Sequence, residues 1–440
     1  MPILRVGASA VDITPPVGTA LDGYGGREDV SLGVHDPLFA RCLFLDDGTT
    51  QLALVVCDLI GIGSFLAQRA RELIAERPGI PPQNVLVAAT HTHAGPAGVR
   101  GRGEAVLVEA TARKIAGAVN VARWGAREAW LKYGTTPLES IAQNRRHPDW
   151  PIDHRLDVLA VDGIDGESIA TVVRYACHPT TMTGGNLDIT AEWPGEACRL
   201  IEQITGGRGI YFNGACANIN PAWIEQRFDE VYRLGSIVGA KAAALSQEMR
   251  PLGGKHRAAN IRWDEFTDKP VSAGRLVGRA PLRALSRTVQ VPYRSGPSDA
   301  EMEALISGLE RELHGVEPGE QRRALTAQLT AARMERIALR RTRDKRPFRD
   351  AEVQAFRLGE GLYAVCLPGE VFVETQEEIR QKSGLVDLLV ITYANDYPGY
   401  FCRPEAYEQG GYEAGVTPFA PEADSILIET ALSVLREVSA

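Results

Sequence analysis

The stretch VLVAATHTHAGPAG, residues 85–98, joins a short apolar run to two histidines and a loop of small residues. Its first half has the length and composition of a buried β-strand, and Ala-Gly-Pro is typical of the turn that ends one. On an extended backbone, His91 and His93 point to the same side because they are two residues apart. Such a pair can bind zinc or another borderline metal ion. Two hydrogen-bonded histidines at the mouth of a loop would leave the same pattern.

Similar apolar runs recur along the chain and alternate with helical patterns. Residues 41–62 and 156–178 each read as strand, turn and strand, whereas residues 64–76 and 191–204 have helical patterns. This alternation predicts an α/β fold, a sandwich of mixed β-sheets flanked by helices.

A charged segment at residues 298–346 differs from the rest. Its apolar residues fall on one helical face, and the break at GVEPGE is followed by a second helix that ends in RRTRDKR. We expect an α-hairpin laid over the sandwich. Its basic end is more simply explained as a solvated face with favourable charge at a helix C-terminus than as a site for an anionic ligand. Strand patterns return at residue 352, so residues 1–440 are expected to form a single domain with this hairpin as an insertion. The residues on the first helical face are Met302, Leu305, Ile306, Leu309 and Leu313.

Composition narrows the possible partners and the location. The formal charge of −8 disfavours a nucleic-acid partner, and no apolar run reaches the roughly 18 residues of a membrane span. The first residues do not resemble a signal peptide. The seven cysteines are scattered, with no Cys-x-x-Cys pair, which indicates reduced thiols and a cytoplasmic protein. The sequence predicts a small-molecule substrate and no particular oligomeric state.

Other potential metal ligands stand where further apolar runs end. His178 closes VVRYACH, Glu370 closes LYAVCLPGE, and Tyr397 and Tyr400 follow LLVITYAND. Each one alone fits a turn or a helix cap equally well. Together they supply nitrogen and oxygen ligands from distant segments, as in catalytic zinc sites with an open position for water.

The motif THTHAGPAG resembles the THTHSGPGG signature of the neutral (non-lysosomal, alkaline) ceramidases, which are zinc amidases that cut the amide of ceramide. Further segments are similar to that family and follow in its order over nearly the whole chain. These segments are VGASAVDITPPVG, GVHDPLFARCLFL, QNRRHP, CHPTTM, PGE and NDYPGY with YEQGGYEAG. The resemblance implies the fold of the ceramidase catalytic domain, here without the family's C-terminal immunoglobulin-like domain.

The resemblance also implies roles for individual residues. It implies one catalytic zinc ion with four ligands, His91, His178, Glu370 and Tyr400. It implies three catalytic residues that do not bind the metal, His93 at the reacting carbonyl, Arg145 near the substrate and Tyr412 supporting the site. Tyr400 is preferred to Tyr397 because of its spacing from Tyr412.

Two segments depart from the family. Asn220, in CANINPAW, stands where the family has a serine at the catalytic centre. Arg100, Arg102 and Glu104 follow the histidine motif, and these charges favour a polar or anionic substrate.

We therefore expect a zinc-dependent hydrolase that cleaves an amide (N-acyl) bond of a small polar substrate by attack of zinc-bound hydroxide. Its site is ceramidase-like, but the departures predict that it is not a true ceramidase. There are two alternatives. The chain is a zinc hydrolase of ester, lactone or glycosidic bonds, or it is a non-catalytic, ligand-binding member of the fold.

Overall fold

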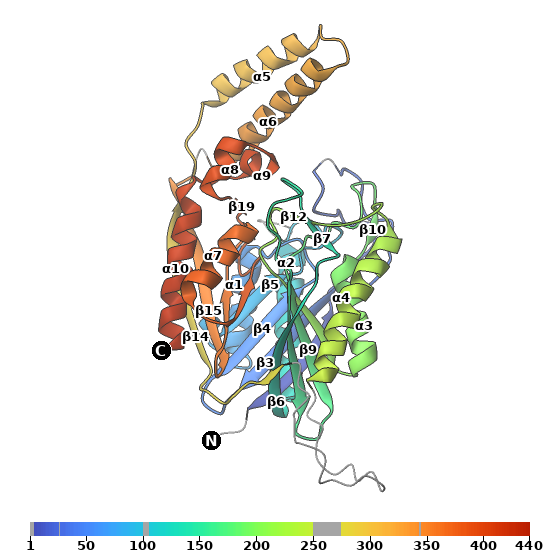
Figure 1. Cartoon of the computed structure of the whole chain (residues 1–440), viewed down its shortest axis with the longest axis vertical. Helices are drawn as coiled ribbons and strands as arrows, with labels where there is room; N and C mark the ends of the chain where they lie inside the picture. The colour runs from blue at the N-terminus through green and yellow to red at the C-terminus, as the bar shows by residue number, and fades with distance from the viewer. Residues whose placement is uncertain (1–3, 26, 100–104, 250–273, 343–344) are drawn as a thin grey trace.

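Two β-sheets packed face to face form the centre of the molecule (Figure 1). The computed structural model describes residues 4–25, 27–99, 105–249, 274–342 and 345–440. Arg100, Arg102 and Glu104, on which the expected substrate polarity rests, lie outside these residues, as do residues 343–344 of the expected hairpin.

The larger sheet is nine-stranded and mixed. Its order is β11-β9-β8-β6-β1-β3-β4-β5, with β13 also paired to β6. Two pairs, β4 with β5 and β9 with β11, are parallel, and the other pairs are antiparallel. The strands are β1 (Arg5–Asp12), β3 (Phe39–Asp46), β4 (Gln51–Cys57), β5 (Val85–Ala89), β6 (Arg127–Pro137), β8 (Arg155–Gly163), β9 (Ser168–Tyr175), β11 (Arg208–Asn213) and β13 (Arg275–Leu276).

The smaller sheet is four-stranded, in the order β14-β15-β16-β18. Its strands are β14 (Arg283–Pro292), β15 (Phe348–Gly359), β16 (Leu362–Cys366) and β18 (Asp387–Ile391). Three short pairs lie at the upper end of the sandwich in Figure 1. They are β2 (Gly33–Val34) with β10 (Asp188–Ile189), β7 (Ala142–Asn144) with β12 (Ile219–Pro221), and β17 (Glu370–Val371) with β19 (Tyr400–Phe401).

Helices cover both outer faces, which gives four layers. The helices α1 (Ser64–Glu76), α2 (Ala105–Trp124), α3 (Glu192–Thr205) and α4 (Phe228–Glu248) pack on the larger sheet. The helices α7 (Val373–Ser383) and α10 (Glu422–Ser439) pack on the smaller one. The remaining short helices are η1 (Pro82–Asn84), α8 (Pro404–Gln409) and α9 (Tyr412–Val416). The predicted α/β sandwich flanked by helices is confirmed.

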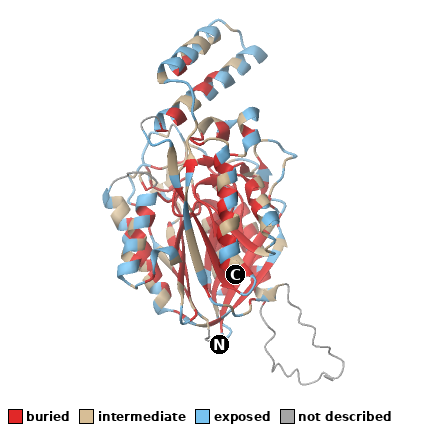
Figure 2. Ribbon diagram, turned by 90° about the vertical axis from the view of Figure 1, so that its left-hand side faces the viewer, coloured by how far each residue is buried: buried red, intermediate tan, exposed pale blue. Residues whose placement is uncertain are grey.

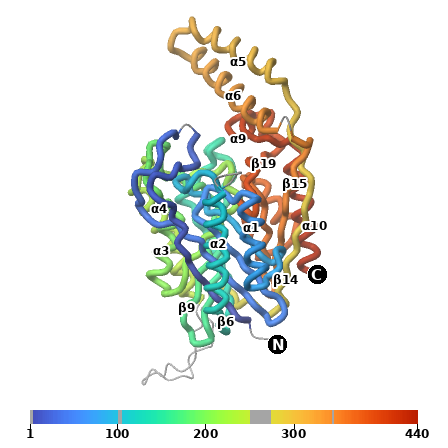
Figure 3. Tube along the Cα trace, turned by 180° about the vertical axis from the view of Figure 1, so that it is seen from behind, coloured from blue at the N-terminus to red at the C-terminus, as the bar shows by residue number. Residues whose placement is uncertain are grey.

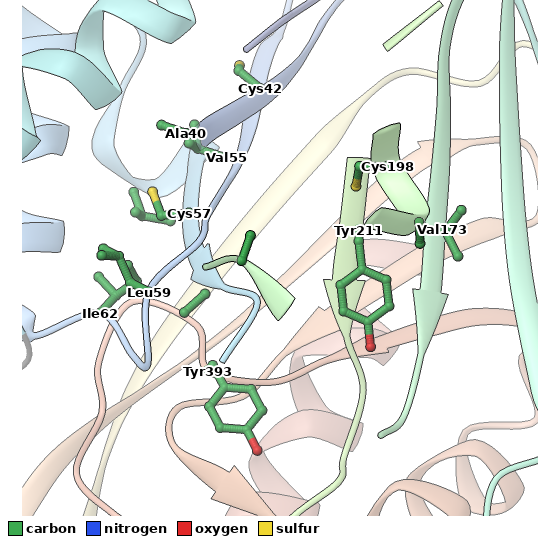
Figure 4. Packing of buried hydrophobic residues seen from close by; sticks show 14 of the residues in the cluster. Ala40, Cys42, Val55, Cys57, Leu59, Ile62, Val173, Cys198, Tyr211 and Tyr393 are labelled. Atoms are coloured by element: carbon green, nitrogen blue, oxygen red, sulfur yellow. The ribbon is translucent and has the colours of Figure 1, made fainter. Parts of the chain in front are cut away.

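Strand alternation explains the two hydrophobic layers that the larger sheet separates. In β3, Leu43 and Leu45 face the smaller sheet, while Cys42 and Phe44 face the helices. Both faces are buried, which is why this strand reads as a continuous apolar run. Figure 2 shows the buried residues concentrated in the sheets, and Figure 4 shows part of the layer on the helix side. All seven cysteines are buried and none forms a disulfide.

Helices α5 (Asp299–Leu313) and α6 (Glu320–Thr342) project beyond the sandwich (Figure 3). A capping box at Ser298 and Glu301 begins α5. The pair buries its own small apolar cluster, which includes Met302 and Ile306 but not Leu305, which is 49% exposed. Leu305 therefore lies off the packed face on which the sequence placed it. Among the described residues, no helix combines the length and the apolarity that a membrane span requires.

Candidate metal centre

His91 follows β5 and lies in the loop where the strand ends. Its backbone is left-handed, with φ of 74°, and the ring stacks on Tyr393 at 4.1 Å between centroids. The ring Nδ1 lies 2.6 Å from the carbonyl oxygen of Ile60. A carbonyl can only accept, so Nδ1 carries the proton and Nε2 keeps its lone pair. Burial lowers the pKa of this imidazole to about 3.

His178 follows β9 and is oriented in the same way. Its Nδ1 donates to the carbonyl oxygens of Cys216, at 2.6 Å, and Ile219, at 3.0 Å. Its Nε2 is buried and has no hydrogen-bond partner among the described residues. Both buried imidazoles therefore use Nδ1 for the protein backbone and leave Nε2 for another partner.

Asn213, the last residue of β11, holds the two histidine loops together. Its side-chain amide donates to the carbonyl oxygen of Thr90, at 3.2 Å, and to that of Cys177, at 3.3 Å. Each of these residues directly precedes one of the histidines. The two ends of separate strands are thus fixed through one buried amide.

Glu370 completes a convergent set of three atoms. Its Oε2 lies 3.6 Å from Nε2 of His91 and 3.4 Å from Nε2 of His178, and it has no hydrogen-bond partner within the described chain. Its Oε1 accepts the hydroxyl of Tyr397. Burial raises the pKa of Glu370, but His91 and His178 outweigh this effect and hold the pKa at about 2. A charged oxygen therefore faces both imidazole nitrogens.

Nε2 of His178 and Oε2 of Glu370, 3.4 Å apart, form an ion pair when the imidazole is protonated. Burial lowers the pKa of His178, but its contacts with Cys216 and Glu370 outweigh burial and raise the pKa to about 9. A metal ion requires the neutral imidazole, so an ion that binds between these groups displaces the proton. Two nitrogens and one carboxylate oxygen, all buried and aimed at one point, fit a zinc ion.

His93 lies beside this set. Its Nε2 is 3.3 Å from Nε2 of His91, and ligand atoms of His91, His93 and His178 all lie within 4.8 Å of one another. Burial lowers the pKa of His93 well below its usual value. The spacing is compatible with a third nitrogen ligand as well as with the substrate-facing role that the family resemblance implies.

Tyr400, Tyr412 and Arg145 lie next to the convergent histidine and glutamate side chains. Glu370 and Tyr400 are register partners in the β17–β19 pair, so these two residues lie side by side. Nη2 of Arg145 donates to the Tyr400 hydroxyl at 3.3 Å, and Nε of Arg145 donates to Oε1 of Glu413 at 2.7 Å. The Tyr412 ring stands perpendicular to that of Tyr400, with centroids 5.8 Å apart, and is 50% exposed. The seven residues to which the family resemblance assigns roles thus lie in one continuous region.

Several residues of the site carried no signal in the sequence. Glu192, read only as part of a helix, is a buried carboxylate that accepts the backbone N–H of His93 at 3.0 Å. The patterns around Asn213 and Tyr393 indicate only strands. Asn220, by contrast, is the residue that the sequence places where the family has a serine. It follows Ile219, whose carbonyl oxygen accepts from His178, and its own Oδ1 is buried without a partner among the described residues.

Known proteins resemble this chain in both sequence and structure. The family profile described as neutral/alkaline non-lysosomal ceramidase, N-terminal, matches residues 4–115. The neutral ceramidase of Pseudomonas aeruginosa is 24% identical over 95% of this chain and 69% of its own length. The neutral ceramidase of Mycobacterium tuberculosis is 26% identical over 95% of this chain and 74% of its own length.

Solved structures agree with the fold. The crystal structure of the Pseudomonas aeruginosa enzyme superposes with a TM-score of 0.74 at 20% identity, covering 100% of this chain and 76% of that one. A ceramidase complexed with C2 gives a TM-score of 0.75 over 99% and 76% of the two chains, also at 20% identity. The expectation from the sequence that the chain is not a true ceramidase is not borne out, because these relatives are themselves neutral ceramidases.

Proposed function

We propose that this chain, which is similar in sequence to neutral ceramidases over 95% of its length, is a zinc-dependent hydrolase that cleaves an amide (N-acyl) bond. The observation that carries this proposal is the convergence of Nε2 of His91, Nε2 of His178 and Oε2 of Glu370 at one buried point. The names of the relatives make ceramide the first substrate to test. The cytoplasmic location predicted from the sequence remains a prediction.

The proposed ligands are the four that the family resemblance implies, His91, His178, Glu370 and Tyr400. Tyr397 donates its hydroxyl to Oε1 of Glu370, which leaves Oε2 of that carboxylate for the metal. Tyr400 is held opposite Glu370 by the strand pairing. When bound, zinc supplies a Lewis acid and lowers the pKa of a water to about 7.

The other polar groups of the site act on the substrate. Glu413 and Tyr400 hold the guanidinium of Arg145, so that its charge is available to the carbonyl oxygen that becomes negative during attack. Tyr412, half exposed at the edge of the site, supports this position from the solvent side. His93, whose Nε2 lies 3.3 Å from Nε2 of His91, takes the proton that the attacking water releases and passes it to the leaving nitrogen.

Metal analysis and hydrolysis test the proposal directly. The purified protein should contain one zinc ion per chain and release fatty acid from a short-chain ceramide, and both properties should vanish with a chelator and return with zinc. His91→Ala and His178→Ala should each lose the zinc and at least about 99% of the activity. His314→Ala, at the exposed end of α5, is the matched control and should change neither. A wild-type protein without bound zinc would overturn the proposal.

A further inference from the structure

Glu192 is a completely buried carboxylate beside the metal centre, with 0% exposure. Its Oε1 accepts the backbone N–H of His93 at 3.0 Å. Its Oε2 accepts both the backbone N–H, at 2.6 Å, and the hydroxyl, at 2.8 Å, of Thr181. Burying a carboxylate is costly, and here the charge is met by donors from two loops and not by an ion pair within the described residues.

The two loops that Glu192 joins are those of the proposed ligands. His93 follows His91 in the first loop, and Thr181 follows His178 in the second. We infer that Glu192 is a positioning residue, which sets the place of the His93 imidazole relative to the two metal-facing histidines. The expected effect on catalysis rests on the proposed function, whereas the contacts of Glu192 are independent of it.

The backbone of His93 is held on both sides of the residue. Glu192 binds its N–H, and a guanidinium nitrogen of Arg27 donates to its carbonyl oxygen at 3.0 Å. Gly23 packs so closely that an added Cβ would lie 2.7 Å from the His93 Cα. With the backbone fixed in this way, the imidazole has little freedom except rotation about its own side-chain bonds.

Glu192 is itself held in an unfavourable conformation. Its φ is 52°, in the left-handed region that a glutamate rarely adopts. Its N–H donates to the hydroxyl of Thr190 at 2.9 Å, and the carbonyl oxygen of Thr190 accepts the hydroxyl of Thr92 at 2.7 Å. Thr190 thus binds Thr92, and Glu192 binds His93. These contacts with the histidine loop explain why the strained backbone at Glu192 persists.

A glutamine cannot replace this carboxylate, because both oxygens face N–H donors. The amide oxygen of glutamine can accept the N–H of either His93 or Thr181. The NH₂ group, itself a donor, then faces the remaining N–H and cannot bind it. Glu192→Gln should therefore release one loop without changing the size of the side chain. Glu196→Gln is the matched control: Glu196 is also buried, one turn further along α3, and binds Arg199 instead of the loops.

The catalytic test measures kcat and KM for short-chain ceramide with zinc-loaded protein. We expect Glu192→Gln to lower kcat about 100-fold, as a small displacement of a catalytic group does, while KM stays within about threefold. Zinc stoichiometry should remain one per chain, and Glu196→Gln should match the wild type. Glu192→Gly, which relieves the left-handed backbone but lacks the carboxylate, should be as inactive as Glu192→Gln. Wild-type kcat in either Glu192 variant would overturn the inference.

A double-mutant cycle tests whether Glu192 acts through His93. If it does, Glu192→Gln combined with His93→Ala should have the kcat of His93→Ala alone. Losses that multiply in the double variant would show that Glu192 acts by another route.

Hydrogen exchange gives a readout that is independent of activity. In Glu192→Gln, amides in the peptides that contain His93 and Thr181 should exchange at least about tenfold faster than in the wild type and in Glu196→Gln. Unchanged exchange would overturn the inference even if activity falls. If the wild type binds no zinc, the proposed function fails, and the exchange data alone decide whether Glu192 holds the loops.

Discussion

Four residues other than glycine have a left-handed backbone in the described part of the chain, His91, Glu192, Tyr393 and Asn395. Glu192 begins α3, and the other three lie in loops around the candidate metal centre. Tyr393 stacks on His91, and Asn395 accepts the N–H of Val87 in β5, the strand that leads to His91. Such conformations cost of order 1–3 kcal/mol each and persist where the surrounding structure enforces them. The strain of this fold is therefore concentrated where its polar groups converge.

His93 is the residue whose role the geometry leaves most open to experiment. We predict that His93→Ala lowers kcat for ceramide at least about 100-fold and retains one zinc ion per chain, because the four proposed ligands remain. Metal analysis of the dialysed variant, together with its kinetics, provides the measurement. Loss of zinc from this variant would instead identify His93 as a third nitrogen ligand, which the 4.8 Å cluster allows.

The sequence identifies those site residues that end an apolar run. His91, His178 and Glu370 do so, and a strand that ends in a polar residue is visible without any knowledge of tertiary contacts. Glu192 could not be recognised in this way, because it begins an ordinary amphipathic helix and its importance lies in partners at positions 93 and 181. The hydrogen bond from Tyr397 to Glu370 could not be predicted either, because it forms only when the two segments meet in the folded chain.

At the scale of elements, the two-residue pair β17–β19 positions Glu370 against Tyr400. Gly369 precedes it with φ of 66°, and an added Cβ would lie 2.4 Å from the carbonyl oxygen of Gly399. Gly369→Ala should therefore destabilise the protein by about 3 kcal/mol and weaken zinc binding, since both the backbone conformation and the packing are lost. Urea unfolding and competition with a zinc chelator measure the two effects.

Gly384 provides a matched control for this substitution. It has the same φ of 66° at the C-terminus of α7, and an added Cβ would meet nothing within 4 Å. Gly384→Ala should cost only about 1 kcal/mol and leave zinc binding unchanged. Equal losses in the two variants would contradict the importance of the close approach at Gly369.

Asp424 links α10 to α7 and to the residue that precedes α8, on the helix-covered outer face of the smaller sheet. It lies on α10 and accepts the hydroxyl of Thr375 on α7, at 2.5 Å, and a guanidinium N–H of Arg403 before α8, at 2.8 Å. Burial raises the pKa of this carboxyl from 3.8 to about 6, despite these two partners. The folded protein therefore binds the proton more tightly than the unfolded chain does.

This raised pKa predicts a pH dependence of stability. The contribution of Asp424 is fully present below about pH 4 and is lost as the pH rises to about 6, by roughly 1.4 kcal/mol per pH unit. Asp424→Asn should remove this slope from urea unfolding of the zinc-free protein between pH 4 and 7. Glu429→Gln, on the exposed side of the same helix, should keep the slope. An unchanged slope in Asp424→Asn would assign the effect to other groups.

The strands and helices of the sandwich were predictable because both sheets are covered on both sides. The central runs of β3, β4 and β5, residues 42–45, 52–57 and 85–89, are apolar, which is the pattern of strands buried on both faces. The three short pairs near the site were not predictable, since two-residue strands such as β17 and β19 have no periodicity of their own. Long-range pairing alone defines them.

At the scale of the whole molecule, the α5–α6 pair interrupts a connection between neighbouring strands. Pro292 at the end of β14 pairs with Phe348 at the start of β15, and the N–H of Tyr293 donates to the carbonyl oxygen of Pro347 at 2.9 Å. The chain therefore leaves and returns at one point, and the two helices have an apolar cluster of their own. This arrangement is typical of an insertion, as the sequence predicts, although the organisation as a single domain remains a prediction.

Replacing residues 296–345 by a short glycine-serine linker tests this interpretation. The shortened protein should unfold cooperatively and bind one zinc ion, because the insertion contributes no proposed ligand. Its kcat/KM should fall about tenfold, or about 1.4 kcal/mol, because α9 carries Tyr412 and loses its contact with α6 through Arg294. Circular dichroism, metal analysis and kinetics provide the measurements. Loss of cooperative unfolding would show that the helices are integral to the core.

The wide spacing of the proposed ligands along the chain has a consequence for biosynthesis. His91, His178, Glu370 and Tyr400 belong to segments that meet only when both sheets are assembled. On the ribosome, the nascent polypeptide therefore cannot form the complete centre until Tyr400 has emerged from the exit tunnel. Until then, the early His-Thr-His segment lacks its later partners and holds any metal ion only weakly. Loading of the proposed zinc ion would therefore require that translation and folding have both reached the last quarter of the protein.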